Sequence, residues 1–76
     1  MKYVNEYVSI GEKVRIEYLE IDEIEILCWL CDYSMLGYMD NVNMFLKLSD
    51  KGEKSMVYIK NIEPGTGRIE LTRTLY

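Results

Sequence analysis

The chain has 76 residues, 49% of them hydrophobic, and a formal net charge of −4 at pH 7. This length predicts one small domain, residues 1–76, with a thin core of its own. Histidine, the commonest general base, is absent and no activated-nucleophile motif can be assembled, so we expect no enzyme activity and no cofactor. The richest apolar run, residues 24–39, is interrupted by Glu25 and Asp32, which excludes a membrane-spanning segment.

Two further features concern location and assembly. Residues 1–13 lack the apolar middle and the small-residue cleavage site of a signal peptide, so we expect a cytoplasmic protein. Seven tyrosines and one tryptophan are many for a domain of this size. Such a domain is a candidate for burying apolar surface against copies of itself, so we expect a homo-oligomer.

The first half of the chain changes from helical to extended periodicity. Apolar residues within 3–8 recur at the i, i+4 spacing of a short N-terminal helix, with an extended segment as the alternative. After Gly11, apolar and charged residues alternate over 14–18, as a half-buried strand requires. A second strand is expected over 24–30, where both faces are apolar, and Trp29 on it is expected to be largely inaccessible in the folded assembly.

Three further strands are expected in the second half, at residues 42–48, 56–62 and 69–76. Residues 33–38 contain serine and glycine and are expected to form a bend before the first of them. A polar, glycine-containing turn at 49–52 precedes the next. Proline and two glycines at 64–67 form the strongest break in the chain.

This order of elements predicts a mostly β fold. Five short antiparallel strands that follow a short helix indicate a small, strongly bent five-stranded antiparallel barrel. The strand pattern alone fits an SH3-like or an OB-type barrel.

Two groups of residues have the composition of chemical sites. Cys28 and Cys31 form a C-x-x-C, the spacing of a redox pair or of half a zinc site. Residues three apart on a strand point to opposite faces, which favours two packed cysteines. Carboxylates gather over 17–25, but no loop of EF-hand spacing accompanies them. We interpret this cluster as a solvated turn that protects a strand edge, and we expect no metal site.

Two stretches have a more specific pattern. Residues 37–50 read GYMDNVNMFLKLSD, in which a glycine-aromatic start leads to an acidic residue and then to an asparagine ahead of three apolar residues. Residues 56–61 read MVYIKN. The two stretches resemble the two signatures of Sm-like RNA-binding proteins. The resemblance implies one Sm-like domain whose RNA-binding residues are Asp40, Asn41, Asn43, Lys60 and Asn61.

The resemblance also implies a function. Sm-like modules are non-enzymatic, and their subunits join edge to edge into rings that bind short single-stranded RNA around the pore. We therefore expect a ring of about five to seven subunits, with residues 56–62 and 68–75 as the pairing edges. In the implied site Lys60 neutralises phosphate, and Asn43 reads a base edge.

The distribution of charge keeps two other hypotheses open. Residues 1–40 carry nine acidic and three basic side chains, a net −6, whereas residues 41–76 carry four and six, a net +2. Any RNA is therefore expected to meet the second half. The acidic half suggests a small interaction protein that inhibits a nucleic-acid-handling machine by presenting carboxylates where phosphates would sit. A structural ring that has lost RNA binding is the third hypothesis.

Overall fold

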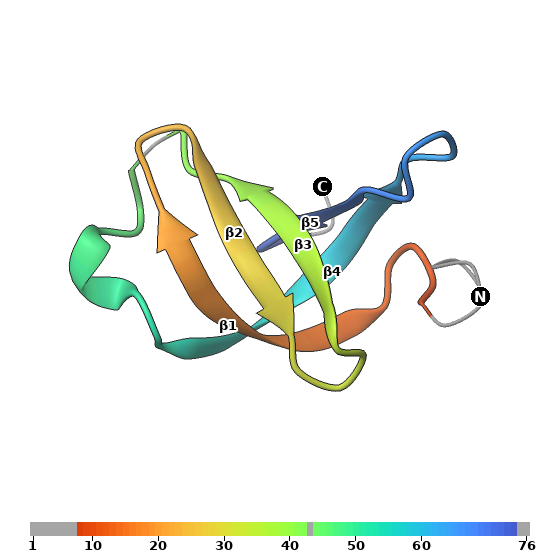
Figure 1. The fold of residues 1–76 in the computed structure, drawn as a ribbon, viewed down its shortest axis with the longest axis horizontal. Coiled ribbons are helices and arrows are strands. Elements are labelled where there is room, and N and C mark those ends of the chain that lie inside the picture. The colour runs from red at the N-terminus through yellow and green to blue at the C-terminus, as the bar shows by residue number, and fades with distance from the viewer. Residues whose placement is uncertain (1–7, 43, 75–76) are drawn as a thin grey trace.

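The computed structural model describes residues 8–42 and 44–74, which form a five-stranded barrel (Figure 1). The elements are β1 Lys13–Ile21, β2 Glu25–Leu30, β3 Met35–Asp40, the 3₁₀ helix η2 Leu48–Asp50, β4 Lys54–Ile62 and β5 Ile69–Thr72. The predicted mostly β, five-stranded barrel is confirmed. The predicted helix over 3–8 lies outside the described residues except for Val8, which is buried. In the described part of the chain, no helix is long and apolar enough to cross a membrane.

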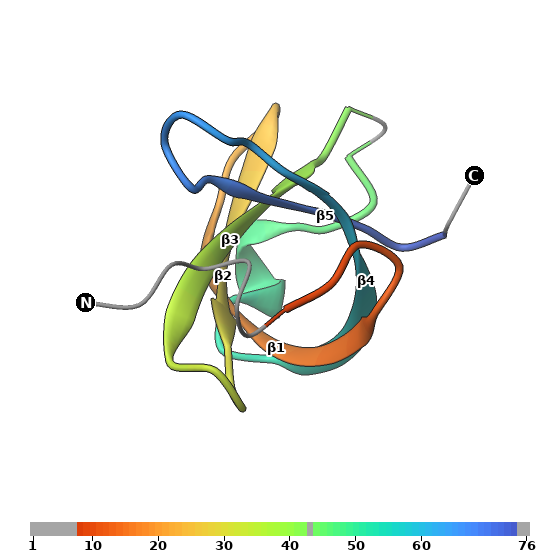
Figure 2. The same cartoon turned by 90° about the vertical axis from the view of Figure 1, so that its right-hand side faces the viewer.

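The strands close in the order β1-β2-β3-β5-β4, and β4 pairs with β1 (Figure 2). Neighbouring strands are antiparallel except β3 and β5, which run parallel, with Tyr38 opposite Glu70 and Met39 opposite Leu71. The predicted all-antiparallel barrel is therefore wrong at this pair. The reason is that β4 pairs with β1 instead of β3, and β5 then fills the gap between β3 and β4 in the direction of β3.

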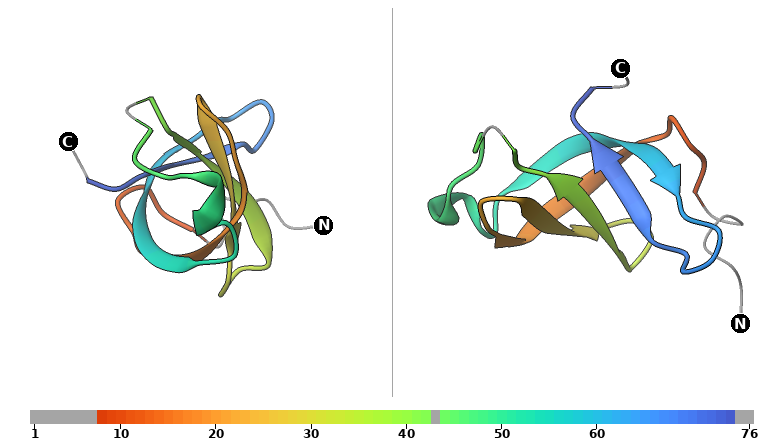
Figure 3. Two further views of the ribbon diagram at one scale, coloured as in Figure 1. Left: turned by 90° about the vertical axis from the view of Figure 1, so that its left-hand side faces the viewer. Right: turned by 90° about the horizontal axis from the view of Figure 1, so that it is seen from above.

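The connection from β3 to β4 crosses one end of the barrel. η2 lies in this connection, and Figure 3 shows it across the barrel end. The prediction of a strand over 42–48 is wrong for the described residues of this range, because 42 and 44–47 belong to the crossing loop and Leu48 begins η2. The predicted bend at 33–38 is wrong from residue 35 onward, since the third strand begins at Met35. The tight turn lies just before it, where Ser34 has a φ of 53°.

Gly37 is the reason why the sequence predicts a bend where the structure has β3. Glycine usually marks a turn, but Gly37 lies inside β3 and is buried. A Cβ atom there would lie 2.8 Å from Cδ1 of Leu30 and 2.8 Å from Cδ1 of Leu71. The glycine therefore serves close packing inside the barrel.

Alternating side chains fill the barrel. The buried apolar residues are Val8, Val14, Ile16, Tyr18, Ile26, Cys28, Leu30, Met39, Val57, Ile59, Ile69 and Leu71. On β2 the inward positions are Ile26, Cys28 and Leu30, which leaves Trp29 on the outer face opposite Glu17. Trp29 is half-buried in the single chain, and its burial in an assembly stays a prediction. Both faces of β2 are apolar, and periodicity could not tell which one faces inward.

Barrel closure also changes the expected route to a ring. β4 pairs with β1 on one side and with β5 on the other. β5 lies between β4 and β3. The two strands predicted to offer free edges thus already have partners on both sides, which is how a barrel removes sheet edges.

Candidate nucleic-acid interface

A cleft of about 280 Å³ opens on the outside of the barrel, where β3 lies beside β5. We call this site the cleft. Its lining residues are Glu25, Tyr38, Met39, Asp40, Lys60, Arg68, Glu70 and Leu71. The β3–β5 ladder is short, with two residue pairs, so the strands diverge beyond it and leave the hollow.

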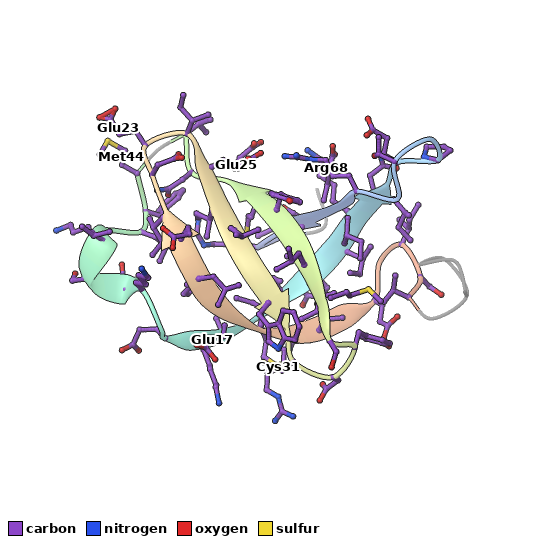
Figure 4. All side chains as sticks on the ribbon, viewed as in Figure 1. Glu17, Glu23, Glu25, Cys31, Met44 and Arg68 are labelled. Atoms are coloured by element: carbon purple, nitrogen blue, oxygen red, sulfur yellow. The ribbon has the colours of Figure 1, made fainter. Side chains whose placement is uncertain are left out.

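Arg68 and Tyr38 form the centre of the cleft. The guanidinium carbon of Arg68 lies 3.9 Å from the centre of the Tyr38 ring. The same guanidinium forms an ion pair with Glu25, and Figure 4 shows the two side chains facing each other. The loop before β5 holds Arg68, whose backbone oxygen accepts a bond of 2.9 Å from the amide of Glu63. The result is a flat cation stacked on an aromatic ring, a geometry that also suits a nucleobase.

The charges in the cleft nearly cancel. Glu25, Asp40 and Glu70 are acidic, and Lys60 and Arg68 are basic. Glu25 already neutralises Arg68, whereas Lys60 on β4 is exposed. The cleft therefore offers one stacking platform and one mobile cation, which suits a single phosphate next to a base more than a long polyanion.

A second cavity of about 290 Å³ adjoins the cleft and shares Lys60 with it. Its lining includes Phe45 and Arg73, whose guanidinium carbon lies 4.7 Å from the centre of the Phe45 ring. The Nη2 atom of Arg73 is buried and has no hydrogen-bond partner among the described residues. Lys60 thus lies between two stacked guanidinium–aromatic pairs.

The structure brings together only part of the predicted site. Asp40 and Lys60 line both cavities, although they lie on β3 and β4. Asn61 is exposed on β4 opposite Glu70, beside the cleft. Asn43 lies outside the described residues.

Asn41 has a structural role instead. Its side chain is 1% exposed, and its Nδ2 donates to the backbone oxygens of Asp22 at 3.0 Å and Leu46 at 3.1 Å. Its Oδ1 accepts from the amide of Leu46 at 3.2 Å. Both protons of the amide are used inside the protein, so the predicted contact of Asn41 with RNA is not supported.

Sequence reasoning missed the aromatic and guanidinium groups of the two cavities. Tyr38 was assigned to a bend, and Phe45 to a strand. Arg68 and Arg73 flank β5 and belong to the basic second half, which was the available signal. Nothing in the sequence pairs each arginine with its ring, because the partners lie far apart along the chain.

The cysteines do not form a site with each other. Both are free thiols; Cys28 faces the core, and Cys31 lies in the turn after β2. Burial raises the pKa of the Cys28 thiol to about 12, and the positive charge of Arg73 opposes this shift. In the described part of the chain, no three Cys, Asp or Glu side chains lie close enough to hold a metal ion.

A closed five-stranded barrel with this order and a parallel β3–β5 pair is an OB-type barrel. Barrels of this class bind oligonucleotides or oligosaccharides on the face of strands 2 and 3 and on flanking loops. The cleft lies on the edge of that face, between β3 and the loop that precedes β5.

Comparisons with known proteins found matches among solved structures. No family model and no curated protein matches the chain. Among solved structures, it is similar to a chain in the crystal structure of the a/eIF2alpha-aDim2p-rRNA complex from Pyrococcus horikoshii OT3, with a TM-score of 0.73 and 22% identity. The match covers 88% of this chain and 45% of that one. At this identity the likeness shows the fold.

Proposed function

We propose that this chain is a non-enzymatic module that binds short single-stranded RNA in the cleft. The observation that carries the proposal is the stack of Arg68 on Tyr38, 3.9 Å apart, beside the exposed Lys60 on the binding side of an OB-type barrel. The similar archaeal chain belongs to a complex that contains rRNA, which supports the same kind of ligand.

Each group has a distinct role in this proposal. A base stacks on the Arg68–Tyr38 pair, and base–aromatic stacking contributes about 1–3 kcal/mol per base. Lys60 neutralises the phosphate next to that base. Because the chain carries a net −4, affinity comes mainly from stacking and falls only gently with salt.

Self-association and Sm-like membership stay predictions. A ring of about five to seven subunits would have to form through side chains on the barrel surface, because β4 and β5 use their edges for closure. The cytoplasmic location predicted from the sequence likewise stays a prediction.

The first experiment measures fluorescence anisotropy of labelled uridine and adenine oligomers at low and moderate salt. Lys60→Ala is expected to weaken binding of both RNAs alike and to lower the salt slope by about 0.7 to 1, the contribution of one phosphate contact. Lys54→Ala is the matched control, an exposed lysine at the other end of the same strand. Equal effects of the two variants would place the RNA elsewhere.

The second experiment removes the aromatic platform. Tyr38→Leu is expected to weaken binding about tenfold while leaving the salt slope unchanged, because stacking is lost and no charge is removed. Tyr58→Leu is the control, a half-buried tyrosine on β4 whose ring lies 6.0 Å from Nζ of Lys13. If the parent protein shows no RNA affinity at low salt, where electrostatic attraction is strongest, the proposal fails.

A second candidate function is inhibition of a nucleic-acid-handling machine through carboxylates. The turn between β1 and β2 favours it, because the Asp22 carboxylate is held by the amides of Ile24 at 2.8 Å and Glu25 at 2.7 Å. Glu23 is exposed beside it. The test adds the protein to a preformed complex of a basic RNA-binding protein with its RNA, and displacement of the RNA by a protein that itself binds none is the supporting result.

A further inference from the structure

One end of the barrel exposes an unusual amount of apolar surface. Five of the large exposed apolar side chains come from the β1–β2 turn, the loop that leads to η2 and the first residue of η2, and we call them the apolar end. They are Ile24 at 73% exposure, Val42 at 70%, Met44 at 56%, Phe45 at 65% and Leu48 at 71%. Single exposed apolar residues are ordinary, but five of them on two neighbouring loops of a small protein indicate an interaction site.

Hydrogen bonds hold the two loops together. The backbone amide of Asn41 donates to the backbone oxygen of Ile24 at 2.8 Å, and the Asn41 side chain reaches both loops. Met44 adopts a φ of 51°, a left-handed conformation that methionine rarely takes, and its amide donates to Asn41 at 2.8 Å. Figure 4 shows Met44 beside Glu23 at the tip of this end. The apolar side chains are thus exposed on two loops that hydrogen bonds hold in place.

The two loops of this end also carry negative charge. Residues 20–24 and 44–53 hold five acidic and two basic side chains, a net −3. One of the two lysines, Lys51, is already paired with Glu20 at 3.3 Å. An apolar surface inside an acidic field is complementary to a partner that is both apolar and basic.

This charge decides between possible occupants. A second copy of the chain would bring two ends with a net charge of −3 together, and an anionic membrane or an RNA would be repelled in the same way. We propose that the apolar end docks a basic amphipathic segment of a partner protein. The proposal rests on the second candidate function, for which it names the class of partner, and it uses none of the cleft residues Tyr38, Lys60 and Arg68.

Three synthetic peptides of about 14 residues, four helical turns, test the proposal. The first carries leucine and lysine on opposite helix faces, the second replaces each lysine by glutamate, and the third replaces each leucine by serine. Each is titrated into the ¹⁵N-labelled protein. We expect the leucine–lysine peptide alone to bind, with amide shifts confined to Ile24, Val42 and residues 44–48.

Matched variants locate the contact. Phe45→Ser is expected to weaken binding of the leucine–lysine peptide about tenfold, a usual loss for a central apolar contact. Leu36→Ser is the control, an apolar residue on β3 with 41% exposure. Glu23→Lys is expected to weaken binding as well, whereas Glu63→Lys, exposed in the loop before β5, is expected to have no effect. Well-dispersed amide spectra confirm that each variant is folded.

Four outcomes would overturn the proposal. Equal binding of the lysine–serine peptide would mean that charge alone acts, and equal binding of the leucine–glutamate peptide would mean that the apolar contact has no charge preference. Shifts centred on the cleft would place the partner on another surface. Shifts of the apolar end by a uridine oligomer would make it part of a nucleic-acid site. Peptide binding without displacement of RNA, in contrast, would leave the docking surface intact and refute only the inhibitory function.

Discussion

The side chain of Asn41 is tied to the backbone of Asp22, since its Nδ2 donates to the Asp22 carbonyl oxygen at 3.0 Å. Its other proton and its oxygen bind Leu46. The β1–β2 turn and the loop that crosses the barrel end therefore share one buried amide, and both the apolar end and the neighbouring cavity depend on its position.

Replacement of Asn41 by alanine is expected to lower the free energy of unfolding by about 1–3 kcal/mol. Three hydrogen bonds are lost, and the carbonyl oxygens that accepted from the side chain stay close to the interior without a donor. Urea denaturation measures the change. Asn61→Ala removes an exposed asparagine on β4 and is expected to stay within about 0.5 kcal/mol of the parent. Equal stability of the two variants would contradict the structural role of Asn41.

Gly37→Ala is expected to destabilise the barrel by about 1–3 kcal/mol, because the added methyl group would overlap with two packed leucine side chains. Gly65→Ala is the control, since a Cβ there meets nothing within 4 Å and Gly65 has no positive φ. Thermal unfolding compares the two variants. A melting temperature of Gly37→Ala at or above that of Gly65→Ala would show that β3 does not approach β2 and β5 so closely.

The two cysteines are expected to differ in reactivity towards a disulfide reagent near pH 8. Cys31 is half-buried and should react in the folded protein. Cys28 is fully buried, and its pKa of about 12 keeps it as the thiol, whereas the thiolate is the reactive form. Titration of thiols should therefore find a single reactive group in native protein and both in denaturant. Native Cys31→Ser protein that still reacts rapidly would refute the burial of Cys28.

Asp22 should make stability depend on pH in the acid range. Hydrogen bonds from the backbone amides of Glu25 and Ile24 lower the pKa of its carboxyl below the ordinary 3.8. A lowered folded-state pKa adds stability above the unfolded-state value, and this stability is lost as the pH falls through the folded-state value. Asp22→Asn should therefore be less stable than the parent at pH 7, and the two should converge at pH values below the folded-state pKa. Urea denaturation across this range measures the difference, and a gap that widens towards low pH would contradict the assignment.

Local patterns in the sequence sufficed for much of the fold. Alternation of apolar and polar residues placed β1, β4 and β5, because the two-residue period of a strand is visible wherever one face is buried. The break at 64–67 is confirmed as a tight turn, in which Gly67 has a φ of 73° and donates to Glu63 at 2.8 Å. Proline and glycine act through their own backbone preferences, so no tertiary contact is needed to recognise such a turn.

Contacts between distant segments decided the position of the third strand, the strand order and the composition of the cleft. Gly37 lies in a strand because Leu30 and Leu71 approach it, and β3 runs parallel to β5 because β4 pairs with β1. Sequence signatures predicted Asp40 and Lys60, which do meet at the cleft, but the stack of Arg68 on Tyr38 exists only after the barrel closes. Strand order and close packing are set by the free energy of the whole core, and a pattern read along the chain contains no information about which strands become neighbours.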